Sequence, residues 1–145
     1  MKKNAFDWYE QNGFPPTVIL LAKEITSQVE KYYDMEFEMI FISNILNEKN
    51  EEYPSLWLFT DQYVVECKNF LTNYDIDIVK YKNSINYINI ITDNSNTLDN
   101  PSPASTMKLR ITLSSDIRCI FDAFGTNCKK LGDIAKLFLK EYKEG

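Results

Sequence analysis

The side chains of this chain that could do chemistry are carboxylates, thiols and a few cations, because the sequence contains no histidine. That absence excludes Ser-His-Asp and Cys-His catalysis, histidine-liganded zinc and the usual general base near neutral pH. Asp75 and Asp77 are two residues apart, so on a strand they would share a face and could bind a divalent metal. The repeat Asp-Ile-Asp-Ile is also typical of an exposed strand face, and we predict this structural role.

The cysteines are Cys67, Cys119 and Cys128, which form no CxxC motif and are odd in number, a poor basis for a disulfide framework. We predict that they are small buried hydrophobic residues in a reducing compartment. The alternative concerns Cys128, which lies near the start of a predicted helix. The helix dipole can lower the pKa of a thiol at that place and make it reactive.

Sequence motifs that bind phosphate or calcium are missing. The four glycines form neither GxxxxGK[ST] nor GxGxxG. The segment "DNSNT", residues 93–97, has oxygen ligands at alternate positions, but Leu98 stands in place of the calcium-loop glycine and Ala104 in place of its glutamate. The sequence therefore predicts no catalytic residue, no metal and no cofactor, and we expect that the chain is not an enzyme.

Three cations are predicted to lie together in an acidic protein. The formal net charge is −5, which argues against nucleic acid and anionic membranes as main partners. Lys108, Arg110 and Arg118 come close to one another if the predicted strands 107–114 and 117–123 pair. Such a face could bind a phosphate or an acidic peptide. The alternative is a solvated face without a partner.

The length of 145 residues predicts one domain over residues 1–145. Hydrophobic periodicity predicts that this domain contains two helices and seven strands. We expect the aromatic lead-in, 1–16, to fold over the core, with a docking motif as the alternative. A helix follows over 17–33 and a second, closing helix over 126–143. The antiparallel strands lie within 36–123, at about 37–41, 55–60, 63–70, 74–81, 85–92, 107–114 and 117–123. Residues 93–106 are rich in Asn, Ser and Pro and are predicted to be a long mobile loop.

The segment "SLWLFTDQYVVECKNF", residues 55–70, is predicted to be a hairpin that turns at Asp61 and Gln62. Alternation places Leu56, Leu58, Tyr63, Val65 and Cys67 on the buried side and leaves Gln62, Glu66 and Lys68 in water. A register shift by one residue would bury Glu66 and Lys68 without partners.

Seven antiparallel strands closed by one C-terminal amphipathic helix resemble the pleckstrin-homology-like (PH-like) fold. The segments that resemble bacterial versions are "WLFTDQYVVECKNF", "DIVKYKNSINYINI" and "LRITLSSDIRCIFDAFGTNCKKLGDIAKLFL". The resemblance covers about residues 36–142. It implies an α+β chain with a seven-stranded antiparallel PH-like sheet or barrel, closed by the C-terminal helix, with an extra N-terminal helix.

The resemblance implies a binding or scaffolding module. Members that bind phosphoinositides use a basic first loop, but here residues 43–54 carry Glu48, Glu51 and Glu52 against Lys49, which disfavours a lipid headgroup. Other members bind a peptide in a groove beside the C-terminal helix. That groove would involve Tyr87, Phe138 and Tyr142.

We therefore expect a non-enzymatic module that binds a protein or peptide partner, or itself. The alternatives are a small-molecule-binding or catalytic NTF2-like α+β cone and a lipid-headgroup binder. The N-terminus lacks the apolar core of a secretory signal, and the longest apolar run, 18–22, is far shorter than the roughly 20 residues of a membrane span. These features indicate a cytoplasmic protein. Abundant Asn, Ile, Lys and Tyr, typical of AT-rich coding, indicate a low-GC bacterium or its phage.

Overall fold

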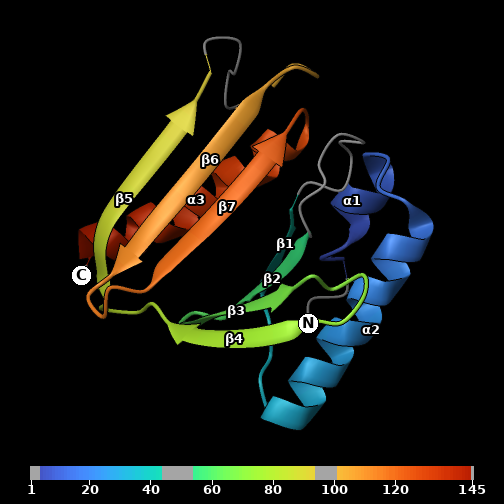
Figure 1. Ribbon diagram of the computed structural model, residues 1–145, viewed down its shortest axis with the longest axis horizontal. Helices are drawn as coiled ribbons and strands as arrows, with labels where there is room; N and C mark the ends of the chain where they lie inside the picture. The colour runs from blue at the N-terminus through green and yellow to red at the C-terminus, as the bar shows by residue number, and fades with distance from the viewer. Residues whose placement is uncertain (1–3, 44–53, 94–100, 145) are drawn as a thin grey trace. The chain divides into compact units, whose positions relative to one another are not determined.

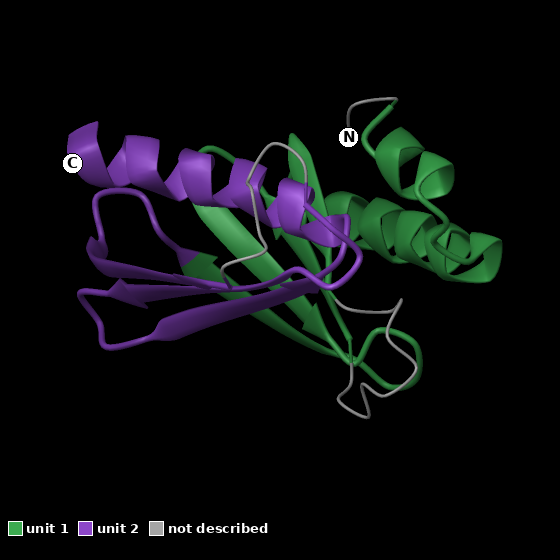
Figure 2. Cartoon of the chain, turned by 90° about the horizontal axis from the view of Figure 1, so that it is seen from above, with its two compact units in different colours: residues 1–79 green, residues 80–145 purple. Residues whose placement is uncertain are grey.

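The computed structural model describes residues 4–43, 54–93 and 101–144 (Figure 1). Its contacts divide the chain into two compact units, residues 1–79 and 80–145 (Figure 2). The first unit contains α1 (Asp7–Gln11), α2 (Pro16–Tyr33), β1 (Met39–Ile42), β2 (Ser55–Phe59), β3 (Tyr63–Lys68) and nearly all of β4 (Asp75–Lys80). The second contains β5 (Ile85–Thr92), β6 (Thr106–Leu113), β7 (Arg118–Phe124) and α3 (Asn127–Glu144).

Helix α2 begins and ends where local chemistry sets its limits. Pro16 occupies the first turn, where its missing N–H costs nothing. Asp34 ends the helix in the left-handed conformation, with φ 52°, and its N–H donates to the Glu30 carbonyl. The helix therefore confirms the prediction of 17–33 to within one residue. Its apolar face is buried through Val18, Ile19, Ala22, Ile25 and Val29.

The aromatic lead-in folds over the core of the first unit, as predicted. Phe6, Tyr9 and Phe14 are buried, and the rings of Tyr9 and Phe14 meet edge to face with 4.9 Å between centroids. The Tyr9 hydroxyl donates to the Ile40 carbonyl at 3.2 Å and accepts from the Ile42 N–H at 3.3 Å, which ties α1 to β1. The sequence did not predict α1, because five residues are too few to show helical periodicity.

The hairpin of β2 and β3 confirms the predicted turn at Asp61 and Gln62. Thr60 stabilises this turn, which contains no glycine, because its Oγ1 accepts from the N–H groups of Gln62 and Tyr63, at 3.1 and 2.8 Å. The strands pair Leu58 with Val65 and Leu56 with Cys67. These four side chains are fully buried in the core that α1 and α2 cover, as the alternation predicted.

The other face of the four-stranded sheet differs from the prediction. Trp57, Phe59 and Val64 are buried there, so β2 is apolar on both faces and simple alternation does not describe it. Glu66, predicted to face water, is half-buried on this face beside Trp57. Tyr63, predicted to be buried, is only half-buried. Gln62 and Lys68 are exposed, as predicted.

In the second unit the strand order is β5-β6-β7, and α3 lies along one face of the three-stranded sheet (Figure 2). Phe138 of α3 is fully buried, with its ring centroid 5.3 Å from that of Tyr81 and 5.7 Å from that of Phe121. Gly125 makes the turn into α3, with φ 58° and the Pro103 carbonyl oxygen 3.4 Å from where a side chain would begin. The buried strand residues under α3 are Met107, Leu109, Ile111, Leu113, Cys119, Phe121 and Ala123.

The structure confirms an α+β chain with antiparallel strands, a C-terminal helix and an additional N-terminal helix. It does not show the predicted single seven-stranded sheet. In the described residues the strands form one sheet of four and one of three, and no closed barrel is found. A turn at Asn83, in the left-handed conformation, separates β4 from β5, and β5 pairs with β6 instead. Residues 44–53 and 94–100, which include most of the predicted acidic loop and half of the predicted mobile loop, lie outside the described residues.

Candidate functional site

The candidate site is the outer face of the three-stranded sheet, by which we mean the face opposite α3. Strand β6 has a strict period of two, with Met107, Leu109 and Ile111 buried under α3 and Lys108 and Arg110 on the other side. The register of β5 and β7 on β6 then fixes which side chains are neighbours. The rows across the outer face are Tyr87–Thr112–Arg118, Asn89–Arg110–Ile120 and Ile91–Lys108–Asp122.

In the described strands the outer face carries three cations and one anion, in a protein whose net charge is −5. Lys108 Nζ lies 3.6 Å from Asp122 Oδ1, so this pair is close to neutral. Arg110 and Arg118 are exposed, and neither makes an ion pair or a side-chain hydrogen bond with any other residue that the structure describes. Two guanidinium groups thus remain available for an anion.

The outer face is hollowed on both sides of Arg110. A hollow of about 440 Å³ is lined by Tyr87, Asn89, Arg110, Thr112 and Arg118. A second hollow, of about 330 Å³, is lined by Arg110, the Lys108–Asp122 pair and neighbouring residues of β5, β6 and β7. Arg110 lines both hollows, so a ligand in either one would contact its guanidinium group.

Apolar side chains stand exposed between these charges. Tyr87 is 55% exposed, Ile91 47% and Ile120 44%. A guanidinium group presents a planar fork of donors that fits a carboxylate with two hydrogen bonds. Exposed apolar side chains add burial energy when a partner covers them. This combination suits an extended segment that carries both acidic and apolar side chains.

The structure brings some of the predicted site residues together and separates others. Lys108, Arg110 and Arg118 share the outer face through the predicted pairing of β6 and β7. Tyr87 lies on the same face, although the sequence analysis placed it in a groove with Phe138 and Tyr142. Phe138 is a core residue with no exposed surface, so its place in a binding groove was wrong. Tyr142 is 44% exposed but belongs to α3, which packs on the opposite sheet face.

Sequence reasoning missed Asn89, Ile91 and Ile120 as members of this face. The signal was present, because Ile91 and Ile120 occupy outward positions in strands whose inward positions are already apolar. An isoleucine at an outward strand position is ordinary on its own. It becomes informative only when the register places it beside an unpaired arginine.

The thiols do not form a reactive site. All three cysteines are free and buried, as predicted. Burial raises the pKa of Cys128 to about 11, with a smaller contribution from the Asp93 carboxylate, although Cys128 is in the first turn of α3. The alternative of a reactive Cys128 thiol with a lowered pKa was therefore wrong. Burial also raises the pKa of Cys67, to about 12.

The carboxylates show no metal-binding geometry in the described part of the chain, where no three Cys, Asp or Glu side chains gather to hold an ion. Asp75 and Asp77 are exposed on β4, which agrees with the exposed strand face that the sequence predicted. Asp77 forms an ion pair with Lys68 of β3, with 2.7 Å between Oδ2 and Nζ. This ion pair between neighbouring strands of the first sheet thus explains the position of Asp77.

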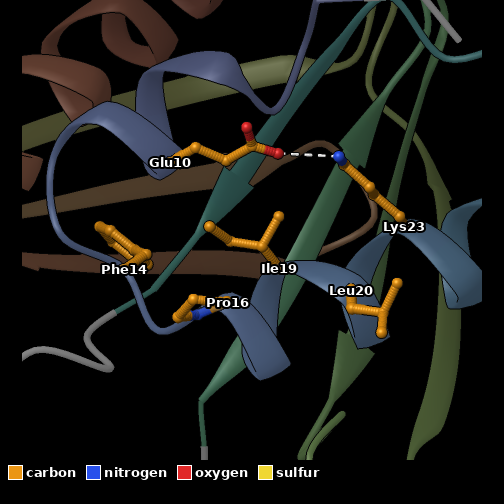
Figure 3. Close-up of a pocket in the computed structure, with 6 residues that line it drawn as sticks. All are labelled: Glu10, Phe14, Pro16, Ile19, Leu20 and Lys23. Carbon is orange, nitrogen blue, oxygen red and sulfur yellow. Dashed lines mark hydrogen bonds and ion pairs between the residues drawn. The ribbon is translucent and has the colours of Figure 1, made fainter.

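A third hollow lies between α1 and α2 in the first unit (Figure 3). Its volume is about 420 Å³, and its lining includes Phe14, Ile19 and the exposed Leu20. Glu10 and Lys23 span it as an ion pair with 2.8 Å between Oε1 and Nζ (Figure 3). These two charges satisfy each other, so this groove offers an apolar surface but no free charged group.

Comparisons with protein families, with curated proteins and with solved structures give no significant match to this chain. Within the residues that the structure describes, no helix has the length and apolar character needed to cross a membrane.

Proposed function

We propose that this chain is a non-enzymatic binding module whose outer face binds an acidic segment of a protein or peptide partner. The observation that carries the proposal is the pair Arg110 and Arg118. Both are exposed and have no partner among the described residues, next to Tyr87 and Ile120, in a protein with a net charge of −5.

The energetics favour an acidic peptide on this face. An exposed ion pair contributes only about 0–1 kcal/mol, because water screens it. A carboxylate that reaches Arg110 in a hollow lined by Tyr87 and Thr112 is partly removed from water. A hydrogen bond to a charged group then contributes about 1.5–3 kcal/mol. Two such contacts and the cover of one aromatic ring give a specific, reversible interaction.

The element order supports the same class of function. The order of elements, seven antiparallel strands followed by a C-terminal amphipathic helix, resembles that of the PH-like fold. PH-like chains commonly serve as binding modules. We also propose that this chain is a cytoplasmic bacterial protein. Fold alone does not fix function, so the side chains of the outer face carry the argument.

The proposal is tested by fluorescence anisotropy with a fluorescein-labelled peptide of alternating glutamate and valine. We expect binding that weakens with salt. The double variant Arg110→Ala/Arg118→Ala should bind at least about tenfold more weakly, a change of about 1.4 kcal/mol. The matched control is Lys136→Ala/Lys140→Ala, which removes the same charge from exposed positions of α3. Equal binding by the two double variants would overturn the proposal.

The alternative functions have tests of their own. The first test is sedimentation with anionic vesicles. If the wild type sediments with them, the Arg110→Ala/Arg118→Ala variant does not, and no peptide binds, then the ligand of this face is a lipid headgroup and not a peptide. Native mass spectrometry of the purified chain tests the NTF2-like alternative. Extra mass retained on the 17.0 kDa chain would support a small-molecule pocket over a peptide-binding face.

A further inference from the structure

Strand β5 is an edge of the three-stranded sheet, and from Tyr87 to Thr92 it lacks the charges, prolines and bulges that keep edge strands apart. Among the described strands it pairs with β6 only, and its residues, "INYINIIT", include no charge and no proline. Tyr87, Ile90 and Ile91 are all at least 40% exposed. An exposed apolar edge presents unpaired N–H and C=O groups and readily pairs with another strand.

Of the other three edges two carry charges, and the third, β1, is covered where the Tyr9 hydroxyl hydrogen-bonds to the Ile40 carbonyl and the Ile42 N–H. Strand β7, at the opposite edge of the same sheet, has Arg118 and Asp122. Strand β4, at the edge of the first sheet, has Asp75, Asp77 and Lys80. Charged side chains at an edge disfavour strand addition, because a second strand would have to approach them. Among these four edges of the described sheets only β5 is open to strand addition.

The sequence of β5 is also symmetric in hydropathy about Asn89. Ile88 and Ile90 flank this residue, and Tyr87 and Ile91 stand two residues away on either side. Asn86 and Thr92, both polar, follow three residues away. A strand with this pattern is complementary to a second copy of itself in the antiparallel direction.

We propose that two copies of this chain associate by antiparallel pairing of β5 with β5, about a twofold axis that passes at Asn89 and is normal to the sheet. This axis keeps every residue on its own face of the sheet, as an antiparallel ladder requires. Tyr87 then lies opposite Ile91 of the second copy, and Ile88 lies opposite Ile90 of the second copy. Asn89 lies opposite Asn89. Every apolar residue from 87 to 91 meets an apolar residue, and no charges meet.

Neighbouring symmetric registers are worse. If the axis passed at Ile88, Tyr87 would lie opposite Asn89 and Asn86 opposite Ile90. If the axis passed at Ile90, Asn89 would lie opposite Ile91. Aromatic and β-branched cross-strand pairs stabilise a ladder by about 0.2–1 kcal/mol each, so these shifts lose the favourable pairs. The bulge between Ile85 and Tyr87 limits the regular edge to the segment that the best register uses.

This association bears on the outer face. Two sheets of three strands would become one continuous sheet of six, with both outer faces on the same side. Arg110 and Arg118 of each copy would then face the same partner. An acidic partner with two segments would bind such a pair more tightly than it binds one copy, through effective concentration.

The test is analytical ultracentrifugation of the full chain over a range of concentrations, with variants at the axis. We expect a reversible dimer of the 17.0 kDa chain. Asn89→Lys places like charges opposite each other and should weaken dimerisation at least tenfold. Asn89→Asp should do the same. An equimolar mixture of the two variants should restore the dimer, because opposite charges then meet at the axis.

The matched control is Ile120→Lys on β7. Like Asn89, Ile120 is a cross-strand neighbour of Arg110, so it adds the same charge beside the same arginine at the other edge. Its dimer should equal that of the wild type. A wild-type chain that stays monomeric at every concentration would overturn the inference, as would a dimer that Asn89→Lys leaves intact. Arg110→Ala/Arg118→Ala should dimerise normally, so failure of peptide binding and failure of dimerisation are separable.

Discussion

Lys108 and Asp122 lie opposite each other across β6 and β7, with 3.6 Å between Nζ and Oδ1. Asp122 is the one anion among the described residues of the outer face, and it neutralises one of three cations there. The charge that the face offers to a partner is therefore set by this carboxylate as much as by Arg110 and Arg118.

The first prediction is that Asp122→Asn strengthens binding of an acidic peptide. The substitution frees Lys108 and raises the charge of the outer face by one. We expect the affinity for the glutamate-valine peptide to rise about three- to fivefold at low salt and the gain to shrink as salt screens it. Anisotropy titrations at two salt concentrations measure this. Asp133→Asn, which removes the same charge from α3, is the control and should have little effect.

The second prediction concerns the core of the first unit. Val65 is fully buried opposite Leu58, within the core that α1 and α2 cover. Val65→Asp would bury a carboxylate without a partner, and we expect a loss of several kcal/mol, enough to unfold the unit. Circular dichroism melting checks this against Ile78→Asp, because Ile78 is 43% exposed on β4. An unchanged melting temperature for Val65→Asp would contradict the observed register.

The sequence predicted the features that depend on short-range periodicity. The strict alternation of Met107, Leu109 and Ile111 with Lys108 and Arg110 predicted β6 and its polar face. The same logic predicted that β7 would bring Arg118 onto that face. Helical periodicity predicted α2 as 17–33, within one residue of its observed limits. Local rules of this kind act within a few residues, and a sequence displays them directly.

The features that were missed depend on contacts between distant residues. Phe138 falls on the apolar face of α3, but its burial depends on contacts with residues distant in the sequence, such as Tyr81 and Phe121. Trp57 and Phe59 are outward positions by alternation and yet are buried, because periodicity within one strand does not show what covers the sheet. The division into sheets of four and three depends on which strand pairs with β5, and alternation gives no information about pairing.

The third prediction is a gain in stability from Glu66→Gln at neutral pH. Burial raises the pKa of Glu66 above its ordinary value of 4.5, and the hydrogen bond from Ser55 Oγ, at 2.6 Å, only partly offsets this. The folded state therefore holds the proton more tightly than the unfolded state. The stability that protonated Glu66 confers is complete below pH 4.5 and is lost as the pH rises through the folded-state pKa. The variant should raise Tm at pH 7 by about 2 °C.

The pH dependence separates this effect from a change in packing. Below pH 4 the wild-type side chain is protonated in both states, so the two proteins should melt at similar temperatures. Glu36→Gln, at an exposed position before β1, is the matched control and should leave Tm almost unchanged at either pH. A Glu66→Gln variant that is less stable at pH 7 would show that the Ser55 hydrogen bond outweighs the cost of burial.

The last prediction concerns the buried thiols. Burial raises the pKa of Cys67 to about 12 and that of Cys128 to about 11, from an ordinary value of 9.0. At pH 8 a thiol-specific reagent should label none of the three cysteines in the folded chain and all three in urea, because all three are buried and the thiols of Cys67 and Cys128 stay protonated. Above pH 9 the thiols of Cys67 and Cys128 ionise in the unfolded chain and retain their protons in the folded chain. Stability should therefore fall between pH 9 and 12, and the fall should be smaller in Cys67→Ala than in the wild type. An equal fall in both proteins would contradict the raised pKa of Cys67.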